Sequence, residues 1–171
     1  MGLSYITFKN IDFEKDAELC IQFRADSYLI SFGSTDAFFE KDGKGDQRYI
    51  AWLKDRIGAT YAGFHIWHQD KIIGQIEMGR RLPEDQFGYI NLYYLIPEMR
   101  GKGLSLEVEE FSMSYLKGLG FNRARLSVSP TNLRAINFYL KNGWKDLGQR
   151  NELGRSRVAL DFPVNYMEKT F

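Results

Sequence analysis

Cysteine is almost absent from the sequence, and long apolar runs are missing altogether. Cys20 is the only cysteine among 171 residues, which excludes an internal disulfide and a multi-cysteine zinc site. No stretch approaches the ~18 apolar residues that a membrane-spanning helix needs, and the opening MGLSYITFKN lacks the basic segment and apolar run of a secretory leader. We therefore expect a soluble protein of the reducing cytoplasm.

An excess of charge of one sign is lacking too. Lysine and arginine number 23 against 22 aspartates and glutamates, a net charge of +1. No overall field therefore favours nucleic acid or an anionic membrane, and an anionic ligand would have to be held locally. With four prolines, no repeat and no low-complexity linker, residues 1–171 are expected to form a single domain.

The hydrophobic period changes several times along the chain, which predicts an alternation of strands and helices. Strands are expected at 4–10, 61–69, 71–81, 88–96, 123–129, 144–150 and 156–164. Helices are expected at 13–30, 46–57, 104–119 and 131–143, with a loop at 31–45.

This order of elements predicts an α/β (α+β) fold. An antiparallel meander is followed by a strand, helix, strand and helix, which implies a mixed, mostly antiparallel sheet of about six to seven strands flanked by about four helices. The fourth and fifth strands should be parallel, because the helix 104–119 provides the crossover that a parallel pair needs.

A glycine-rich segment separates the fourth strand from that helix. Its residues are Arg100, Gly101, Lys102, Gly103, Leu104 and Ser105. The first amides of a helix have no intrahelical partner, and glycines allow an anion to approach the backbone, so the segment predicts a phosphate site. It is neither a P-loop nor a dinucleotide fingerprint. The alternative is a plain turn into a helix.

A second motif lies in NLRAINFYLKNGW, where Asn132, Ala135 and Tyr139 share one helix face and Gly143 and Trp144 follow. With both motifs in this order, the sequence resembles the GNAT family of acyl-CoA-dependent N-acyltransferases, most clearly over residues 60–150. Ser105 stands where the family usually has glycine or alanine.

The resemblance implies the fold and the site. The loop of residues 100–105 would bind the CoA pyrophosphate, and the pantetheine arm would pair with the fourth strand near Leu95 and Ile96, where the fourth and fifth strands splay apart. Asn132 and Ala135 would face the cofactor. Tyr139 would protonate the departing thiolate in a direct transfer from acetyl-CoA that needs no metal. The alternative for Tyr139 is an ordinary core aromatic.

The general base is less obvious from the sequence. Asn91 stands where relatives often carry an acidic residue, and an amide cannot remove a proton from an ammonium group. Glu77 is the first candidate, alone or through a water, followed by Tyr93 and His65. The two histidines, His65 and His68, are three residues apart on a strand and cannot jointly bind one metal ion.

Two clues to the acceptor conflict. Asp36, Glu40 and Asp42 favour a cationic amine, unless their loop is simply solvated, whereas Arg150, Arg155 and Arg157 favour an acidic acceptor. Three functions remain open: acetylation of a small-molecule amine, acetylation of a protein N-terminus or lysine, and non-catalytic CoA binding. A homodimer is possible, and a nucleic-acid partner is not expected because there is no basic excess.

Overall fold

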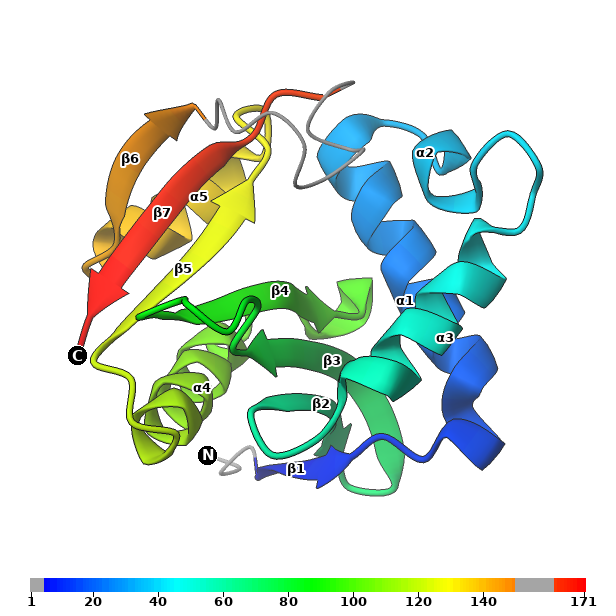
Figure 1. Ribbon diagram of the computed structural model, residues 1–171, viewed down its shortest axis with the longest axis horizontal. Helices are drawn as coiled ribbons and strands as arrows, with labels where there is room; N and C mark the ends of the chain where they lie inside the picture. Colours follow the sequence, from blue (N-terminus) through cyan, green and yellow to red (C-terminus); the bar gives the residue numbers. More distant parts are fainter. Residues whose placement is uncertain (1–4, 150–161) are drawn as a thin grey trace.

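The strands form one seven-stranded sheet in the order β1-β2-β3-β4-β5-β7-β6 (Figure 1). The computed structural model describes residues 5–149 and 162–171. The strands are β1 Ile6–Asn10, β2 Tyr61–His68, β3 Lys71–Gly79, β4 Gly88–Leu95, β5 Arg123–Val128, β6 Lys145–Gln149 and β7 Asn165–Thr170. Neighbours are antiparallel except β4 and β5, which are parallel. The predicted mixed sheet is confirmed.

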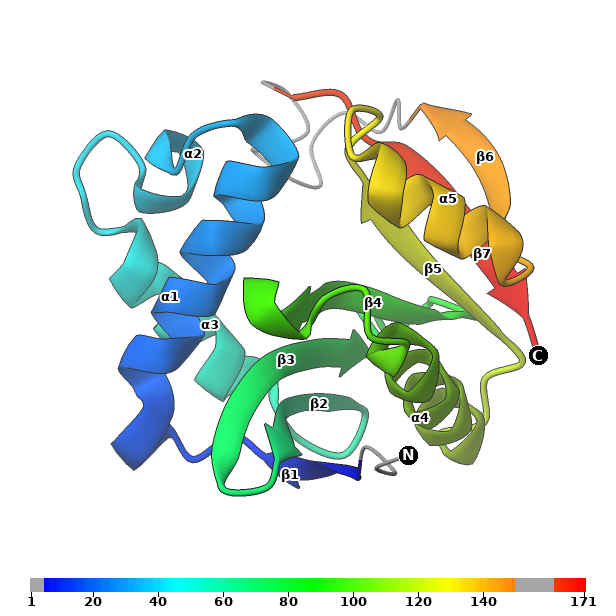
Figure 2. The ribbon, with the colours of Figure 1, turned by 180° about the vertical axis from the view of Figure 1, so that it is seen from behind.

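Helices cover both faces of the sheet (Figures 1 and 2). They are α1 Phe13–Phe32, α2 Asp36–Phe39, α3 Gly45–Arg56, α4 Leu104–Gly118 and α5 Leu133–Lys141, with a 3₁₀ turn, η1, at Pro97–Met99. The first three pack together and cover β2 to β4, whereas α4 contacts β3 and β5, and α5 contacts β6. The two faces therefore have separate cores.

Two elements differ from the sequence predictions. Helix α2 lies in the segment expected to be a loop, because Phe38 is buried with its ring 5.5 Å from that of Tyr28 and 5.6 Å from that of Tyr49. The last strand begins at Asn165. Of its predicted range, 156–161 lies outside the described residues and 162–164 is not in a strand. The charged residues Glu168 and Lys169 conceal β7 in the sequence, because both are paired with residues of neighbouring elements.

Strand β3 separates two environments by the alternation of its side chains. Ile76 and Met78 belong to the apolar core under α4, and neither is exposed to solvent. Gln75 and Glu77, on the opposite face, are equally buried and contact residues of α1 and α3. One face of β3 thus packs in the hydrophobic core, and the other carries a buried polar network.

The sheet opens between β4 and β5. Only three pairs join the two strands, the last being Ile90 with Leu126, although β4 continues to Leu95. Just beyond that pair, Glu77 of β3 is opposite Leu92 while Met78 is opposite Ile90, so Asn91 is the extra residue of a β-bulge. The predicted splaying of the two strands is confirmed, and it creates a gap in the middle of the sheet.

Candidate active site

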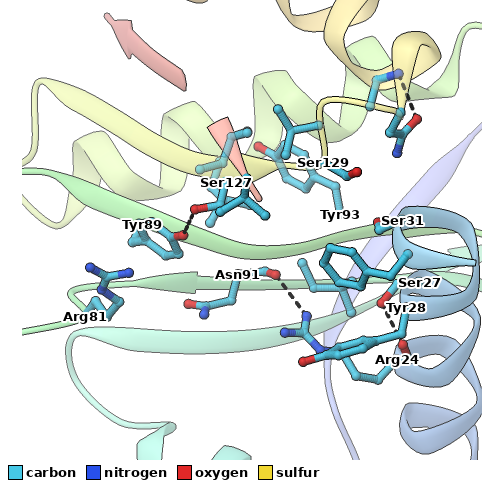
Figure 3. A pocket seen from close by; sticks show the side chains of 18 of the residues that line it. Arg24, Ser27, Tyr28, Ser31, Arg81, Tyr89, Asn91, Tyr93, Ser127 and Ser129 are labelled. Carbon is cyan, nitrogen blue, oxygen red and sulfur yellow. Dashed lines mark hydrogen bonds between the residues drawn. The ribbon is translucent and has the colours of Figure 1, made fainter. Parts of the chain in front are cut away.

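The gap in the sheet contains a pocket of about 560 Å³ (Figure 3). Its walls come from β4, from the end of β5, from the C-terminal half of α1 and from α5. The residues of β4 and β5 that line it are Tyr89, Ile90, Asn91, Leu92, Tyr93, Leu126, Ser127 and Val128. A volume of this size suits a small molecule or part of one.

The bulge at Asn91 is held from two sides. Its backbone carbonyl accepts a hydrogen bond of 2.9 Å from Nη1 of Arg24 in α1, and its Oδ1 accepts one of 2.9 Å from the hydroxyl of Tyr61. Figure 3 shows the bond from Arg24. Together, the two bonds fix β4 at the point where it leaves β5. The amide of Asn91 therefore serves to hold the bulge.

Glu77 lies beneath this region and does not line the pocket. Its side chain is fully buried, and its Oε1 accepts hydrogen bonds from the hydroxyl of Tyr49 and, at 2.9 Å, from Nε2 of Gln75. Its Oε2 lies 3.9 Å from Nη1 of Arg24. Burial opposes the charge on Arg24, but the carboxylate of Glu77, together with the hydroxyls of nearby tyrosines, outweighs burial and raises the pKa of the guanidinium. Glu77 as a base stays a prediction, and it would have to act through one of these neighbours.

The other two base candidates, His65 and Tyr93, lie on opposite faces of the sheet. His65 is 1% exposed, with Nε2 3.1 Å from Oε1 of Gln75, and burial lowers its pKa. Tyr93 lines the pocket, where burial raises the pKa of its hydroxyl well above the usual value. The structure therefore brings Tyr93 to the pocket and leaves His65 in the buried network.

The three residues predicted to share a face of α5 all line the pocket: Asn132, Ala135 and Tyr139. Asn132 also caps the helix, since its Oδ1 accepts a 3.3 Å bond from the amide of Ala135. The Tyr139 ring packs against Trp144 with centroids 5.5 Å apart. Among the described residues its hydroxyl has no hydrogen-bond partner. Burial, and then the charge of Glu109, raise its pKa, so the hydroxyl stays protonated.

The glycine loop follows β4 but does not line this pocket. Gly101 and Gly103 have φ of 74° and 83°, the left-handed region that favours glycine. Gly103 is the N-cap of α4, and no side chain caps that helix, so the amides of its first residues have no side-chain partner. Lys102 is exposed. This arrangement suits an anion near Ser105, in the first turn.

Arg100 points away from such an anion. Its Nε donates a 2.7 Å bond to the carbonyl of Leu95, and its Nη2 lies 3.2 Å from Oδ2 of Asp26 in α1. Lys102 therefore remains the candidate for the positive charge beside the phosphate. Arg100 instead connects the end of β4 to α1. The signal for this pairing is absent from the local motif, because Asp26 is far away in the sequence.

The backbone expected to pair with the pantetheine arm is partly occupied. The amide of Ile96 donates to the carbonyl of Ile73 at 2.9 Å, so Ile96 is turned toward β3. Because successive backbone groups of a strand alternate in direction, those of Tyr93 and Leu95 face the opened side. With the Leu95 carbonyl bonded to Arg100, the accessible groups are the Leu95 amide and the Tyr93 backbone.

Four charged residues near the pocket were not predicted from the sequence. Arg24, Arg56 and Arg81 line it, and Glu109 is buried next to it, accepting 2.7 Å bonds from Nε1 of Trp144 and Nζ of Lys169. Arg24 carries a usable signal, because it lies one helical turn after Cys20, on the apolar side of α1.

The described residues contain neither a metal cluster nor a membrane span. No three His, Cys, Asp or Glu side chains among them are arranged to hold a metal ion. In that part of the chain, no helix combines the length and apolar character needed to cross a bilayer. Cys20 is buried, and its burial raises the pKa of the thiol to about 12, which does not favour a nucleophile.

Several solved structures have an architecture similar to that of this chain. No curated protein matches the sequence significantly. PaiA N-acetyltransferase from Thermoplasma acidophilum, solved with coenzyme A, is similar with a TM-score of 0.72 at 18% identity, over 98% of this chain and 99% of its own. Spermidine N-acetyltransferase from Vibrio cholerae, solved with CoA and spermine, gives 0.69 at 16% identity over 96% and 95%.

The aminoglycoside acetyltransferase AAC(6')-Ib, solved with ribostamycin and CoA, also gives a TM-score of 0.69, at 18% identity over 96% of this chain and 93% of its own. These structures share the fold. The model of the GNAT acetyltransferase family matches residues 25–144, which include the C-terminal part of α1, β4, the glycine loop and α5. The chain belongs to the GNAT family of acetyltransferases, enzymes for which acetyl-CoA is the cosubstrate.

Proposed function

We propose that the protein transfers the acetyl group of acetyl-CoA directly to the primary amine of a small molecule. The observation that carries this proposal is the pocket of about 560 Å³ where β4 and β5 separate, with Tyr139 of α5 on its wall. Family membership supports acetyl transfer, and the size of the pocket favours a small acceptor over a folded protein.

The residues present fit the cosubstrate. The uncapped amides at the start of α4, with Lys102 and Ser105, would hold its pyrophosphate, and the Tyr93 and Leu95 backbone on the open side of β4 would pair with its pantetheine arm. Leu104 begins the helix that supplies these amides. When bound, acetyl-CoA supplies an activated thioester, so no covalent enzyme intermediate is needed.

The chain's own residues supply positioning and one proton. Tyr139 is the proposed general acid, because it lines the pocket and its hydroxyl remains protonated at neutral pH. Backbone amides of β4 beside the bulge at Asn91 would stabilise the developing oxyanion. Glu77 would contribute by fixing Arg24, which in turn holds that bulge, while water accepts the proton of the amine.

Two structural neighbours were solved with small amines, spermine and ribostamycin, which supports a small-molecule acceptor. The clue from Asp36, Glu40 and Asp42 does not bear on the pocket. Both Glu40 and Asp42 lie 2.6 Å from nitrogens of Arg48, and none of the three acidic residues lines the pocket. The three arginines of the other clue lie outside the described residues.

The test is acetyl-dependent release of thiol from acetyl-CoA across a panel of small amines and peptides. We expect turnover with small amines, and CoA should raise the melting temperature because it binds only the folded state. A preference for peptides would indicate protein acetylation. Stabilisation by CoA without any transfer would indicate a binding module, and no response to CoA would refute the proposal.

Ser105→Glu tests the cofactor end separately. A carboxylate in the first turn of α4 suits the helix dipole but repels a pyrophosphate, so CoA affinity should fall at least about tenfold without loss of stability. Ser114→Glu adds the same charge to an exposed position of α4 and is the matched control. Gly103→Val is less informative, because its φ of 83° strains any β-branched residue. Unchanged CoA affinity in Ser105→Glu would place the pyrophosphate elsewhere.

A further inference from the structure

Among the described residues that line the pocket, every charged side chain is positive. Of the described lining residues, Arg24, Arg56 and Arg81 are charged, and none is acidic. The chain as a whole is nearly neutral, so this imbalance is local. A pocket that received a cationic amine would be expected to present carboxylates instead.

Two of these arginines lie at one end of the pocket. Arg81 follows β3, and its guanidinium lies 4.3 Å from the centroid of the Tyr89 ring at the start of β4 (Figure 3). Arg56 ends α3, and its Nη2 donates a 2.9 Å bond to the carbonyl of Arg80, the residue before Arg81. The glycine loop is at the other end of β4. The arginine pair is therefore on the side from which an acceptor would approach an acetyl group delivered along β4.

Within residues 5–149 and 162–171, no carboxylate is paired with either of these two arginines. Arg24 has Glu77 as a partner, but neither Arg56 nor Arg81 forms an ion pair with a described residue. Burial opposes the charge on Arg81, whereas a hydrogen bond with the neutral side chain of Tyr166 favours it. Asp85 acts on Arg81 only at longer range, and its Oδ2 accepts the amide of Leu82. Nε of Arg56 is buried without a hydrogen-bond partner. A buried donor without a partner is costly, which points to a ligand that supplies one.

We infer that the acceptor amine carries an anionic group, a carboxylate or a phosphate, which Arg56 and Arg81 bind. This rests on the proposed acetyl transfer and adds the substrate class. Guanidinium groups bind such oxyanions through paired hydrogen bonds, which fix the orientation as well as the affinity. When the anionic group of the acceptor is bound by Arg56 and Arg81, its amine is directed toward the bulge at Asn91, where transfer would occur. A polyamine would instead meet two like charges.

The first experiment compares matched amines at fixed acetyl-CoA. Each set contains an amino acid, its carboxamide and its decarboxylated amine, and a second arm pairs an aminoalkyl phosphate with its amino alcohol. We expect kcat/KM for the anionic member to exceed that of its neutral counterpart by about tenfold or more, as for one charge-assisted bond. The arm with the larger preference identifies carboxylate or phosphate.

Equal or better acetylation of the carboxamides, decarboxylated amines or a polyamine would overturn the inference while leaving acetyl transfer intact. Loss of transfer with every amine, together with no stabilisation by CoA, would instead refute the proposed function. The two failures are therefore distinguishable.

The second experiment removes the charges. Arg81→Gln and Arg56→Gln should each raise KM for the anionic acceptor about tenfold or more and reduce its preference over the carboxamide, while stabilisation by CoA is retained. Lysine at either position should restore part of the preference. Arg48→Gln, on the same helix as Arg56 but outside the pocket, is the control. If Arg56→Gln fails to fold, Arg81→Gln decides alone, and an unchanged preference in it overturns the inference.

Discussion

Two buried glutamates on opposite faces of the sheet have the same pattern of hydrogen bonds and the same number of nearby cations. Glu77 on β3 is 0% exposed and Glu109 on α4 is 1% exposed. Each accepts two hydrogen bonds at Oε1, leaves Oε2 without a hydrogen bond, and has one nearby cation. The cation is Arg24 for Glu77 and Lys169 for Glu109. By burial and hydrogen bonding alone, either could be taken for a catalytic carboxylate.

They differ in what surrounds them. Glu77 is hydrogen-bonded to the hydroxyl of Tyr49, in a network closed by α1 and α3. Glu109 acts on Tyr139, which lines the pocket and whose hydroxyl has no hydrogen-bond partner among the described residues. Burial of a carboxylate therefore does not by itself indicate catalysis. What matters is whether a neighbouring group lines the pocket and has no other partner. We expect the Glu77 network to contribute mainly stability and the Glu109 side mainly chemistry.

Tyr139→Phe should give the largest effect on activity. The substitution keeps the ring and its packing on Trp144 but removes the proposed proton donor, so turnover should fall about ten- to a thousandfold, with CoA affinity and melting temperature little changed. Turnover, CoA binding and thermal unfolding are measured on one preparation. Near-normal turnover would show that water, and not Tyr139, protonates the departing thiolate. The Glu109 side of the sheet would then have no chemical role to distinguish it from the Glu77 side.

The two glutamates can be compared by Glu77→Gln and Glu109→Gln. In the first, Arg24 keeps its charge and its bond to the Asn91 carbonyl, yet loses its counterion, so we expect a loss of about 3 kcal/mol in the free energy of unfolding. In the second, Lys169 can turn to water on its flexible stem, and the loss should be nearer about 1 kcal/mol. Denaturant unfolding measures both. Equal losses would show that the two sites are equivalent.

The sheet, its parallel pair and the face of α5 could be predicted from the sequence, because hydrophobic period and helical spacing are local properties. The positions of Asn132, Ala135 and Tyr139 on the pocket wall follow from the same spacing. Glu77 shows the limit of such reasoning. Alternation on β3 places it opposite Ile76 and Met78, but only the packing of α1 and α3 decides that its face is closed rather than open to substrate.

Long-range pairing limits the prediction in two other places. Arg100 belongs to the loop motif, yet its guanidinium binds Asp26, 74 residues away. Glu168 and Lys169 made β7 look solvent-exposed, although they pair with Arg125 and Glu109. In each case the sequence contains the charge but not its partner, and the partner determines where the side chain points.

Tyr49→Phe is the counterpart of Tyr139→Phe on the Glu77 side. Removing its hydroxyl leaves Oε1 of Glu77 with one donor, Gln75, in a site without access to water, so the free energy of unfolding should fall by about 1–3 kcal/mol. Turnover per folded molecule should change by less than about threefold, as expected for a network remote from the reacting atoms. Calorimetry and initial rates check both expectations. A large loss of turnover with unchanged stability would place the Glu77 network in the catalytic machinery.

Acid should reduce the stability of the Glu77 network through His65. Burial keeps the folded-state pKa of His65 below its ordinary value of 6.5. The unfolded chain therefore binds more protons in that window, and stability should fall as pH decreases from about 6.5 toward the folded-state pKa, by at most about 1.4 kcal/mol per pH unit for one proton. The carboxylate of Asp16, 3.8 Å from Nδ1, opposes the shift only in part. His65→Gln should flatten this slope and His68→Gln should not, as measured by denaturant unfolding between pH 5 and pH 8. If the slope is unchanged in His65→Gln, the group that titrates lies outside the Glu77 network.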